Sequence, residues 1–133
     1  MKKHITVVGA VITRNDLVYC ARRSLTGALP GMWEFPGGKV EQNESFEQAL
    51  VREIDEELGC KIVVLKPLET TTHEYEFAVI TLATFLCDLV AGEPRSNEHV
   101  EEEWVPLERL GSLKWAPADI PAVAKLQATG VWR

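Results

Sequence analysis

The sequence predicts an α/β fold in which a β-sheet lies between two helices. Three observations lead to this class: segments rich in β-branched and apolar residues alternate with turn residues, two other segments have helical features, and strands and helices are interleaved along the chain. Such elements bury their apolar faces by layering helices on a sheet, which predicts an α/β/α arrangement. Because the chain has no repeat or linker and is long enough to bury one core, we expect a single domain over residues 1–133.

Five strands are predicted from apolar and β-branched runs, at 4–12, 17–22, 61–66, 77–88 and 103–105. The first two flank residues 13–16 (TRND), a sequence that is suited to a hairpin turn. A short aromatic segment follows at 32–35, and we expect residues 36–38 (PGG) to break it, because proline and glycine interrupt regular structure.

Two helices are predicted, from about 45 to 58 and from 118 to 128. Ser45 offers an N-cap to the first helix, and Gly59 suits the position just after its last turn. The second helix has Pro121 in its first turn, where proline is tolerated. The predicted buried stripe of the first helix has a spacing of four residues and consists of Phe46, Leu50, Ile54 and Leu58.

Composition and charge exclude several classes of function. The net charge of −6 argues against binding of long nucleic acid, which depends on clustered Lys and Arg. No apolar run approaches the roughly twenty residues of a membrane span, and the start has no signal-peptide pattern, so we expect a cytoplasmic protein without a membrane partner. Cys20, Cys60 and Cys87 lie in apolar contexts without metal-ligand or redox spacing, which predicts reduced cysteines in the core.

Three acidic residues of the first predicted helix lie where negative charge is costly. On a helical wheel Glu57 falls within the buried arc, Glu53 lies at its edge, and Glu56 shares their face. Carboxylates this close repel one another, and partial burial raises the cost. Mg²⁺ or Mn²⁺ would relieve the repulsion, because carboxylate oxygens are ligands that these cations prefer. The wheel alone is equally consistent with a solvated helix whose acids lie near the core boundary.

The spacing around these acids resembles the Nudix box, the signature of the Nudix hydrolases. Five residues separate Gly38 from Glu44, seven more precede Arg52-Glu53, and residues 54–59 read IDEELG. All seven fixed polar or glycine positions match, an agreement expected by chance at about one in 10⁸ starting points from average residue frequencies. Cys60 is the one departure, at a position where the family has a bulky apolar residue. Residues 22–23, 34–39, 92–94 and 117–126 also look like MutT-type members.

The resemblance implies the Nudix fold, an α/β/α sandwich with a mixed central β-sheet, and a metal-dependent hydrolase. MutT-type members hydrolyse (deoxy)nucleoside triphosphates to a monophosphate and pyrophosphate, often to remove oxidised nucleotides from the pool and so protect DNA. We therefore expect a free nucleotide substrate of the 8-oxo-dGTP or CTP/5-hydroxy-dCTP type, Mg²⁺ or Mn²⁺ as cofactor, and a monomer or weak homodimer.

Two alternatives stay open within the same family. One is hydrolysis of ADP-ribose or a nucleoside-diphosphate sugar, although such members usually carry extra N-terminal structure. The other is a nucleotide sensor without turnover, although such proteins commonly lose box glutamates. The intact box therefore favours the triphosphate hydrolase.

The family's metal-binding and catalytic roles carry over to matching positions. The implied metal ligands are the carbonyl of Gly37 and the carboxylates of Glu53, Glu56, Glu57 and Glu98. Glu53 is the expected general base, which takes the proton of the attacking water. Arg52 is expected to orient Glu56 or Glu44. The expected catalytic set is therefore Glu44, Arg52, Glu53, Glu56 and Glu57.

Substrate contacts are implied at both ends of the nucleotide. The expected substrate-binding residues are Arg23, Phe35, Gly38, Lys39, Phe77, Leu82 and Asp119. Arg23 and Lys39 are candidates to hold phosphate oxygens, whereas the apolar members would surround the base. Asp119 matches the position that contacts the base edge, and because a carboxylate only accepts hydrogen bonds, it should favour an edge rich in donors. Asp119 could instead be a helix N-terminal acid that interacts with the helix dipole.

Two further features concern histidine and arginine. His73 and His99 match no motif, and we expect both to be ordinary surface or strand residues. MutT-type members that bind 8-oxoguanine tightly have an arginine in the turn before the fourth long strand. Residues 74–79 contain no basic residue, which argues against strict selectivity for 8-oxoguanine.

Overall fold

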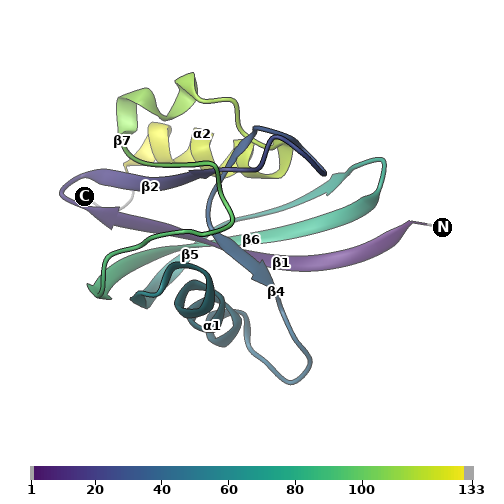
Figure 1. Ribbon diagram of the computed structural model, residues 1–133, viewed down its shortest axis with the longest axis horizontal. Coiled ribbons are helices and arrows are strands. Elements are labelled where there is room, and N and C mark those ends of the chain that lie inside the picture. Colours follow the sequence, from purple (N-terminus) through teal and green to yellow (C-terminus); the bar gives the residue numbers. More distant parts are fainter. Residues whose placement is uncertain (1, 131–133) are drawn as a thin grey trace.

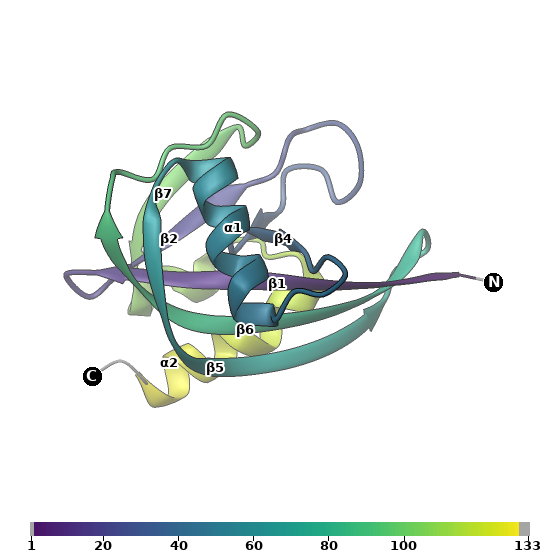
Figure 2. The same ribbon diagram turned by 90° about the horizontal axis from the view of Figure 1, so that it is seen from below.

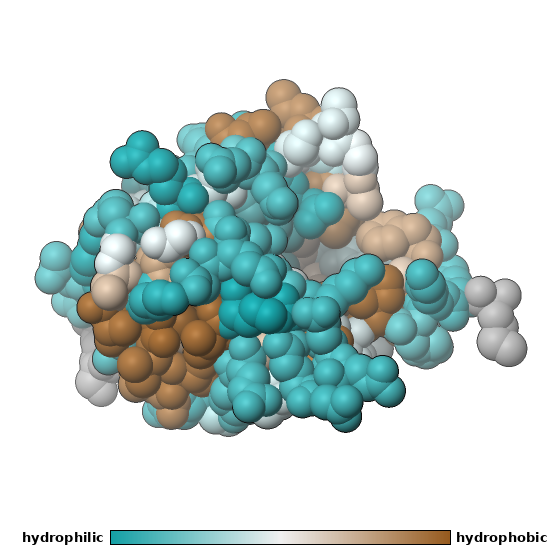
Figure 3. All heavy atoms as spheres, turned by 60° about the horizontal axis from the view of Figure 1, so that its bottom comes forward, coloured by the Kyte–Doolittle hydropathy of each residue, from teal (hydrophilic) through white to brown (hydrophobic). Residues whose placement is uncertain are grey.

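The computed structural model describes residues 2–130 and has the predicted α/β/α layers. In Figure 1 the sheet crosses the middle of the molecule, with helix α1 (Phe46–Leu58) on one side and helix α2 (Ile120–Thr129) on the other. Two short 3₁₀ helices precede α2, namely η1 (Leu107–Ser112) and η2 (Pro117–Asp119). Within residues 2–130 no helix is long and apolar enough to cross a membrane. Seen from the side on which α1 lies, the surface is mostly hydrophilic, with apolar side chains gathered at one end (Figure 3).

Within the described residues the middle layer is a seven-stranded mixed sheet, as the resemblance implied. Its strands are β1 (Lys3–Arg14), β2 (Leu17–Arg22), β3 (Trp33–Glu34), β4 (Gly37–Lys39), β5 (Lys61–Glu74), β6 (Ala78–Ala91) and β7 (Glu101–Pro106). β1 runs parallel to β6 and pairs antiparallel with β4 and with the start of β2. β5 pairs with β6, and β2 pairs with both β3 and β7. Figure 2 shows α1 lying across this sheet.

The two faces of the sheet carry separate apolar cores, because successive residues of a strand point to opposite faces. On one face Val8 and Ile12 of β1 lie in one cluster with Leu50 of α1. On the other face Val11 lies in a cluster with Leu126 of α2. The three cysteines are buried in these cores, as predicted. Each helix is therefore fixed to the sheet by its own apolar contact.

Helix α1 begins and ends close to its predicted limits. Ser45 Oγ accepts a hydrogen bond from Gln48 N at 3.0 Å, and the Gln48 side chain accepts one from Ser45 N at 2.9 Å, which forms a capping box. Gly59 ends the helix in the left-handed conformation, with a φ of 64°. The predicted buried stripe is wrong at Phe46, which is 38% exposed, whereas Ala49 is buried. The small Ala49 side chain lets the first turn lie close to the sheet, which leaves the larger Phe46 at its margin.

Several strands extend beyond their predicted limits. β5 continues through Pro67 to Glu74, because register shifts on both sides of the proline form bulges in its pairing with β6. β5 lies at an edge of the sheet, where a missing backbone N–H is tolerated. Residues 36–38 were expected to break the aromatic segment; β3 does end at Glu34, but Gly37 and Gly38 belong to β4, which pairs with β1. The second predicted helix is also wrong at its start, since residues 117–119 form η2 and α2 follows at Ile120.

Replacement of Gly37 by Ala should destabilise the fold, because a Cβ at this position would overlap the carbonyl oxygen of Val8 in the paired strand. Since backbone on both sides must move, we expect a loss on the order of 3 kcal/mol in the free energy of unfolding. Urea denaturation of the full chain measures it. Gly111→Ala is the matched control, because its Cβ would meet only the flexible end of Gln127, at 3.2 Å. Equal midpoints for the two variants would contradict the close packing of β4 on β1.

Candidate active site

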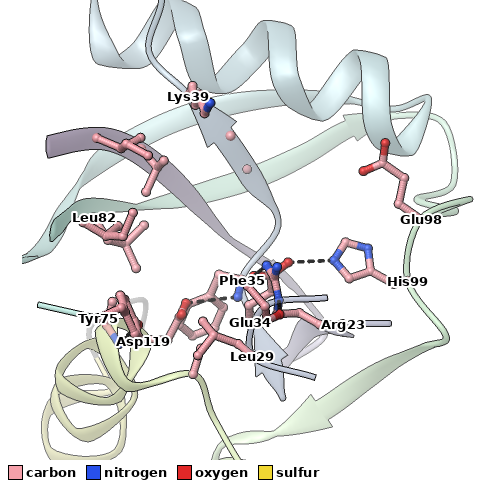
Figure 4. Close-up of a pocket in the computed structure, with 18 of the residues that line it drawn as sticks. Arg23, Leu29, Glu34, Phe35, Lys39, Tyr75, Leu82, Glu98, His99 and Asp119 are labelled. Carbon is pink, nitrogen blue, oxygen red and sulfur yellow. Dashed lines mark hydrogen bonds and ion pairs between the residues drawn. The ribbon is translucent and has the colours of Figure 1, made fainter. Parts of the chain in front are cut away.

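A cleft of about 440 Å³ opens where β4, the β5–β6 hairpin and two loops meet. The first loop, residues 23–32, joins β2 to β3, and the second, residues 95–100, precedes β7. Figure 4 shows α1 on one side of this cleft and the segment that carries Asp119 on the opposite side. A cleft of this size is in the range that holds a small ligand. Its two ends differ in chemistry.

One end of the cleft is apolar and closely packed. Phe35 and Leu82 line it and are only 4% and 7% exposed, which agrees with their predicted place in an apolar wall. Tyr75 lines the same end, and its hydroxyl accepts a hydrogen bond from Ala118 N at 2.9 Å. Phe77 differs, because it is 51% exposed and stacks on Tyr75 with ring centroids 5.2 Å apart. Phe77 therefore lies at the rim, whereas Tyr75 belongs to the wall together with Phe35.

Asp119 is a buried carboxyl group at this apolar end. It is 4% exposed, and its Oδ1 accepts a hydrogen bond from Phe35 N at 3.2 Å. Burial, followed by the negative charge of Glu34, raises the pKa of Asp119 well above its ordinary value. The neutral form is thereby favoured, and a neutral carboxyl group both donates and accepts hydrogen bonds. The groups that Asp119 can recognise therefore extend beyond the donor-rich edge expected from the sequence.

The opposite end of the cleft is formed by the bare backbone of β4 and the acidic face of α1. Gly37 and Gly38 both line the cleft. A Cβ on Gly38 would overlap the carboxylate of Glu53, so the absence of a side chain lets that carboxylate lie directly against the strand. The helix and the glycine pair, adjacent in the predicted motif, are therefore in contact in the fold.

Arg52 organises the carboxylates around it. Its Nε lies 2.6 Å from Glu44 Oε2, and its Nη1 lies 2.9 Å from Glu53 Oε2. Weaker ion pairs reach Glu41 at 3.3 Å and Glu56 at 3.5 Å. The hydrogen bond from Arg52 lowers the pKa of Glu44. Glu44 and Glu53 thus both bind the guanidinium of Arg52 at short distance. The contact with Glu56 is the longest of the four.

Within residues 2–130, Glu57 and Glu98 form no ion pair with an arginine or lysine. Glu57 is half-buried and lines the cleft, and Glu98 faces it from the 95–100 loop (Figure 4). Burial, followed by the charges of Glu98 and Glu53, raises the pKa of Glu57 to about 7. Of the three predicted metal ligands on α1, Glu57 alone lines the cleft, whereas Glu53 lies against Gly38 and Glu56 is exposed.

This donor set fits a hard divalent cation. The available oxygens are carboxylates and the carbonyl of Gly37, which are ligands that such cations prefer, and the pKa of Glu57 is raised by burial first and by the charges of Glu98 and Glu53 second. Within residues 2–130 no three acidic, histidine or cysteine side chains already stand in a metal-binding arrangement. Arg52 instead holds part of the set through Glu44 and Glu53. The side chains must therefore converge when a cation binds.

Arg23, Glu34 and His99 form a polar cluster between the two ends of the cleft (Figure 4). Arg23 Nη1 donates to Glu34 Oε1 at 2.9 Å, and His99 Nε2 lies 2.8 Å from Glu34 Oε2. Burial alone would lower the pKa of His99, but the hydrogen bond to Glu34, with the charges of Glu34, Glu57 and Glu98, outweighs it and raises that pKa. Arg23 is therefore in the cleft as predicted, although Glu34 occupies part of its guanidinium.

The prediction that His99 is an ordinary surface residue is wrong, since its side chain is only 6% exposed and contacts Glu34. No local pattern indicated this contact, because 65 residues separate the two partners. His73 does lie in a strand, as predicted, and its ring packs against that of Tyr75 at an interplanar angle of 56°. Lys39 lies exposed at the edge of the cleft beside the glycine pair. Tyr75 and Glu34 are cleft residues to which sequence analysis gave no role.

Known proteins are similar to this chain over nearly its whole length. The family model described as the NUDIX domain matches residues 3–126. An 8-oxo-dGTP diphosphatase of Escherichia coli (strain K12) is 35% identical over 127 residues, which cover 96% of this chain and 98% of that protein. A CTP pyrophosphohydrolase of the same strain is 36% identical over 126 residues, covering 95% of this chain and 93% of that protein.

Solved structures agree with the sequence comparisons. The solution structure of the E. coli ORF135 protein has a TM-score of 0.86 at 36% identity, covering 99% of this chain and 94% of that one. The solution NMR structure of DNA mismatch repair protein MutT (family Nudix hydrolase) from methicillin-resistant Staphylococcus aureus 252 has a TM-score of 0.81 at 49% identity. That alignment covers 98% of this chain and 100% of that one. Since fold, family model and relatives agree along nearly the whole chain, it belongs to the Nudix family of hydrolases.

Proposed function

We propose that this Nudix hydrolase uses a divalent cation, Mg²⁺ or Mn²⁺, to hydrolyse (deoxy)nucleoside triphosphates to a monophosphate and pyrophosphate. The main support for the proposal is that the two ends of one cleft differ in chemistry. Its apolar end, with Phe35, Leu82 and Tyr75, suits a nucleobase, and its acidic end suits a phosphate chain that arrives with a cation. Relatives along the whole chain are named 8-oxo-dGTP diphosphatase and CTP pyrophosphohydrolase, which supports a triphosphate substrate.

The base end supports recognition through both stacking and hydrogen bonds. The exposed ring of Phe77, stacked on Tyr75, extends the apolar wall to the rim of the cleft. Asp119 lies at the inner end, where it can pair with the edge of a base. In its neutral form Asp119 offers one donor and one acceptor. This suits bases with both groups on one edge, a property that common and oxidised nucleobases share, so the substrate panel below decides between them.

At the other end, the cation would be held by the Gly37 carbonyl and by Glu53, Glu57 and Glu98, with Glu56 joining from the exposed side of α1. When bound, a divalent cation neutralises charge on the phosphate oxygens and activates water. Lys39 and the free part of the Arg23 guanidinium lie where they can contact the same phosphates. These positive groups and the cation together offset the acids of the site.

The chemistry assigned to the protein's own residues is the placement of water and the transfer of its proton. The oxygen of water bonds to a phosphorus of the triphosphate, and the bridging P–O bond breaks with its electron pair on the leaving phosphate oxygen. Glu53 accepts the water proton, and Arg52, anchored by Glu44, fixes the orientation of that carboxylate. The fixed orientation matters because a general base acts only within hydrogen-bond reach of its proton.

Glu53→Gln tests this assignment directly. The full chain with Mg²⁺ is incubated with common NTPs and dNTPs, 8-oxo-dGTP, 5-hydroxy-dCTP and ADP-ribose, and the products are separated. We expect monophosphate and pyrophosphate from a triphosphate, with kcat lowered about 10²- to 10⁴-fold in the variant. Glu47→Gln is the matched control, because Glu47 is exposed in the first turn of the same helix and outside the cleft.

Three results would contradict the proposal. Stepwise release of inorganic phosphate would show a different reaction. Turnover of ADP-ribose alone would identify the alternative hydrolase class. Binding of a nucleotide without turnover would indicate a sensor.

Asp119→Asn tests whether the buried carboxyl group is neutral. An unfolded Asp ionises near pH 3.9, whereas burial holds Asp119 protonated to higher pH in the folded chain. The folded state therefore binds more protons above about pH 4, and stability is lost as the pH rises towards the folded-state pKa. Asn keeps the acceptor for Phe35 N without this loss. We expect the Tm of the variant minus that of the wild type to grow between pH 4 and pH 8. A constant or shrinking difference would show that Asp119 is ionised in the fold.

A further inference from the structure

The 95–100 loop is fixed to the body of the protein at both ends. Arg95 N donates to the carbonyl of Leu58, the last residue of α1, at 3.1 Å. Val100 N donates to the carbonyl of Arg22 at the end of β2, at 3.0 Å. Between these points the loop carries Glu98 over the acidic end of the cleft (Figure 4). The position of the Glu98 carboxylate thus depends on what holds the middle of the loop.

Ser96 gives the middle of the loop its shape. Its Oγ accepts hydrogen bonds from Glu98 N and His99 N, both at 3.2 Å. Its own N–H donates to Glu102 Oε1 at 2.8 Å. These bonds define a tight turn, but each of them lies within the loop or joins it to β7. None of them reaches the cleft.

His99 makes the connection between the loop and the cleft. Its Nδ1 lies 2.7 Å from Ser96 Oγ, and its Nε2 lies 2.8 Å from Glu34 Oε2. Because Ser96 Oγ already accepts from two backbone N–H groups, its own proton is directed to Nδ1, and Nε2–H is left to donate to Glu34. Glu34 is itself held by Arg23 through its other oxygen, at 2.9 Å. An unbroken chain of hydrogen bonds therefore runs from Arg23 through Glu34 and His99 to Ser96.

We propose that His99 is a positioning residue, which ties the 95–100 loop to Glu34 and so holds Glu98 beside Glu57 at the cation end of the cleft. The proposal rests on the proposed function, in which Glu98 is a cation ligand. His99 itself contacts neither the cation nor the water, and it acts through the loop. Residues that orient a ligand in this way typically change metal affinity 10- to 100-fold when they are removed.

The loop contact is tested first in the absence of metal and nucleotide. Hydrogen exchange of backbone amides 96–100 is compared for the full-length wild type, His99→Ala and His99→Gln. We expect faster exchange at Glu98 and His99 in the Ala variant and partial restoration in the Gln variant, whose amide can still donate to Glu34. His4→Ala is the matched control, because His4 is exposed on β1 outside the cleft. Unchanged exchange in His99→Ala would overturn the proposal.

Binding of Mn²⁺ to the same proteins without nucleotide, followed by electron paramagnetic resonance, tests the consequence for Glu98. We expect the Kd for Mn²⁺ to rise about tenfold in His99→Ala and in Glu98→Gln. The double variant should bind no more weakly than Glu98→Gln, because His99 acts only through Glu98. Additive losses, or wild-type affinity in His99→Ala, would overturn the proposal.

Two features keep this test decisive. If His99→Ala does not fold, Glu34→Ala removes the partner that ties the ring to the cleft, leaves the hydrogen bonds of Ser96 in place, and should give the same faster exchange and weaker Mn²⁺ binding. Neither readout requires turnover. A chain that binds Mn²⁺ through Glu98 and His99 but hydrolyses no triphosphate would therefore contradict the proposed function alone.

Discussion

The contact between the two glycines of β4, Gly37 and Gly38, and the acidic face of α1 is the constraint on which the site depends. A Cβ on Gly38 would occupy the space of the Glu53 carboxylate, and a Cβ on Gly37 would overlap the backbone of β1. The two glycines therefore serve different ends, because one permits the strand pairing and the other permits the approach of the helix. The capping box at Ser45 and the left-handed Gly59 fix where α1 begins and ends, and so fix which of its acidic residues lie opposite β4.

Charge is balanced unevenly across the cleft. Arg52 lies among Glu41, Glu44, Glu53 and Glu56, and it offsets much of the charge on the outer side of α1. Among the described residues, no arginine forms an ion pair with Glu57. Its pKa is raised to about 7 by burial and by the nearby charges of Glu98 and Glu53. Repulsion between these carboxylates raises the free energy of the site, and a bound cation would relieve that repulsion. The same acids that weaken the fold would thus strengthen cation binding.

Local signals predicted the elements that depend on nearby residues. The caps of α1, the hairpin turn at Asn15-Asp16 and the seven box positions all follow from short spacings. The sequence did not predict the continuation of β5 through Pro67, because only the pairing with β6 and its bulges compensate for the missing N–H. It also gave His99 no role, because the contact with Glu34 joins residues brought together by β2, β3 and β7. The neutral state favoured at Asp119 likewise depends on burial, which spacing does not report.

The most direct test of the account is the location of the cation. A ¹⁵N-labelled full chain is titrated with substoichiometric Mn²⁺, and paramagnetic broadening is followed at each backbone amide. We expect the signals of Gly37, Gly38 and residues 53–58 to broaden first, followed by those around Glu98. Broadening centred instead on the acidic residues 101–103 of β7, with β4 and α1 unaffected, would show that the cation binds elsewhere and would contradict the central claim.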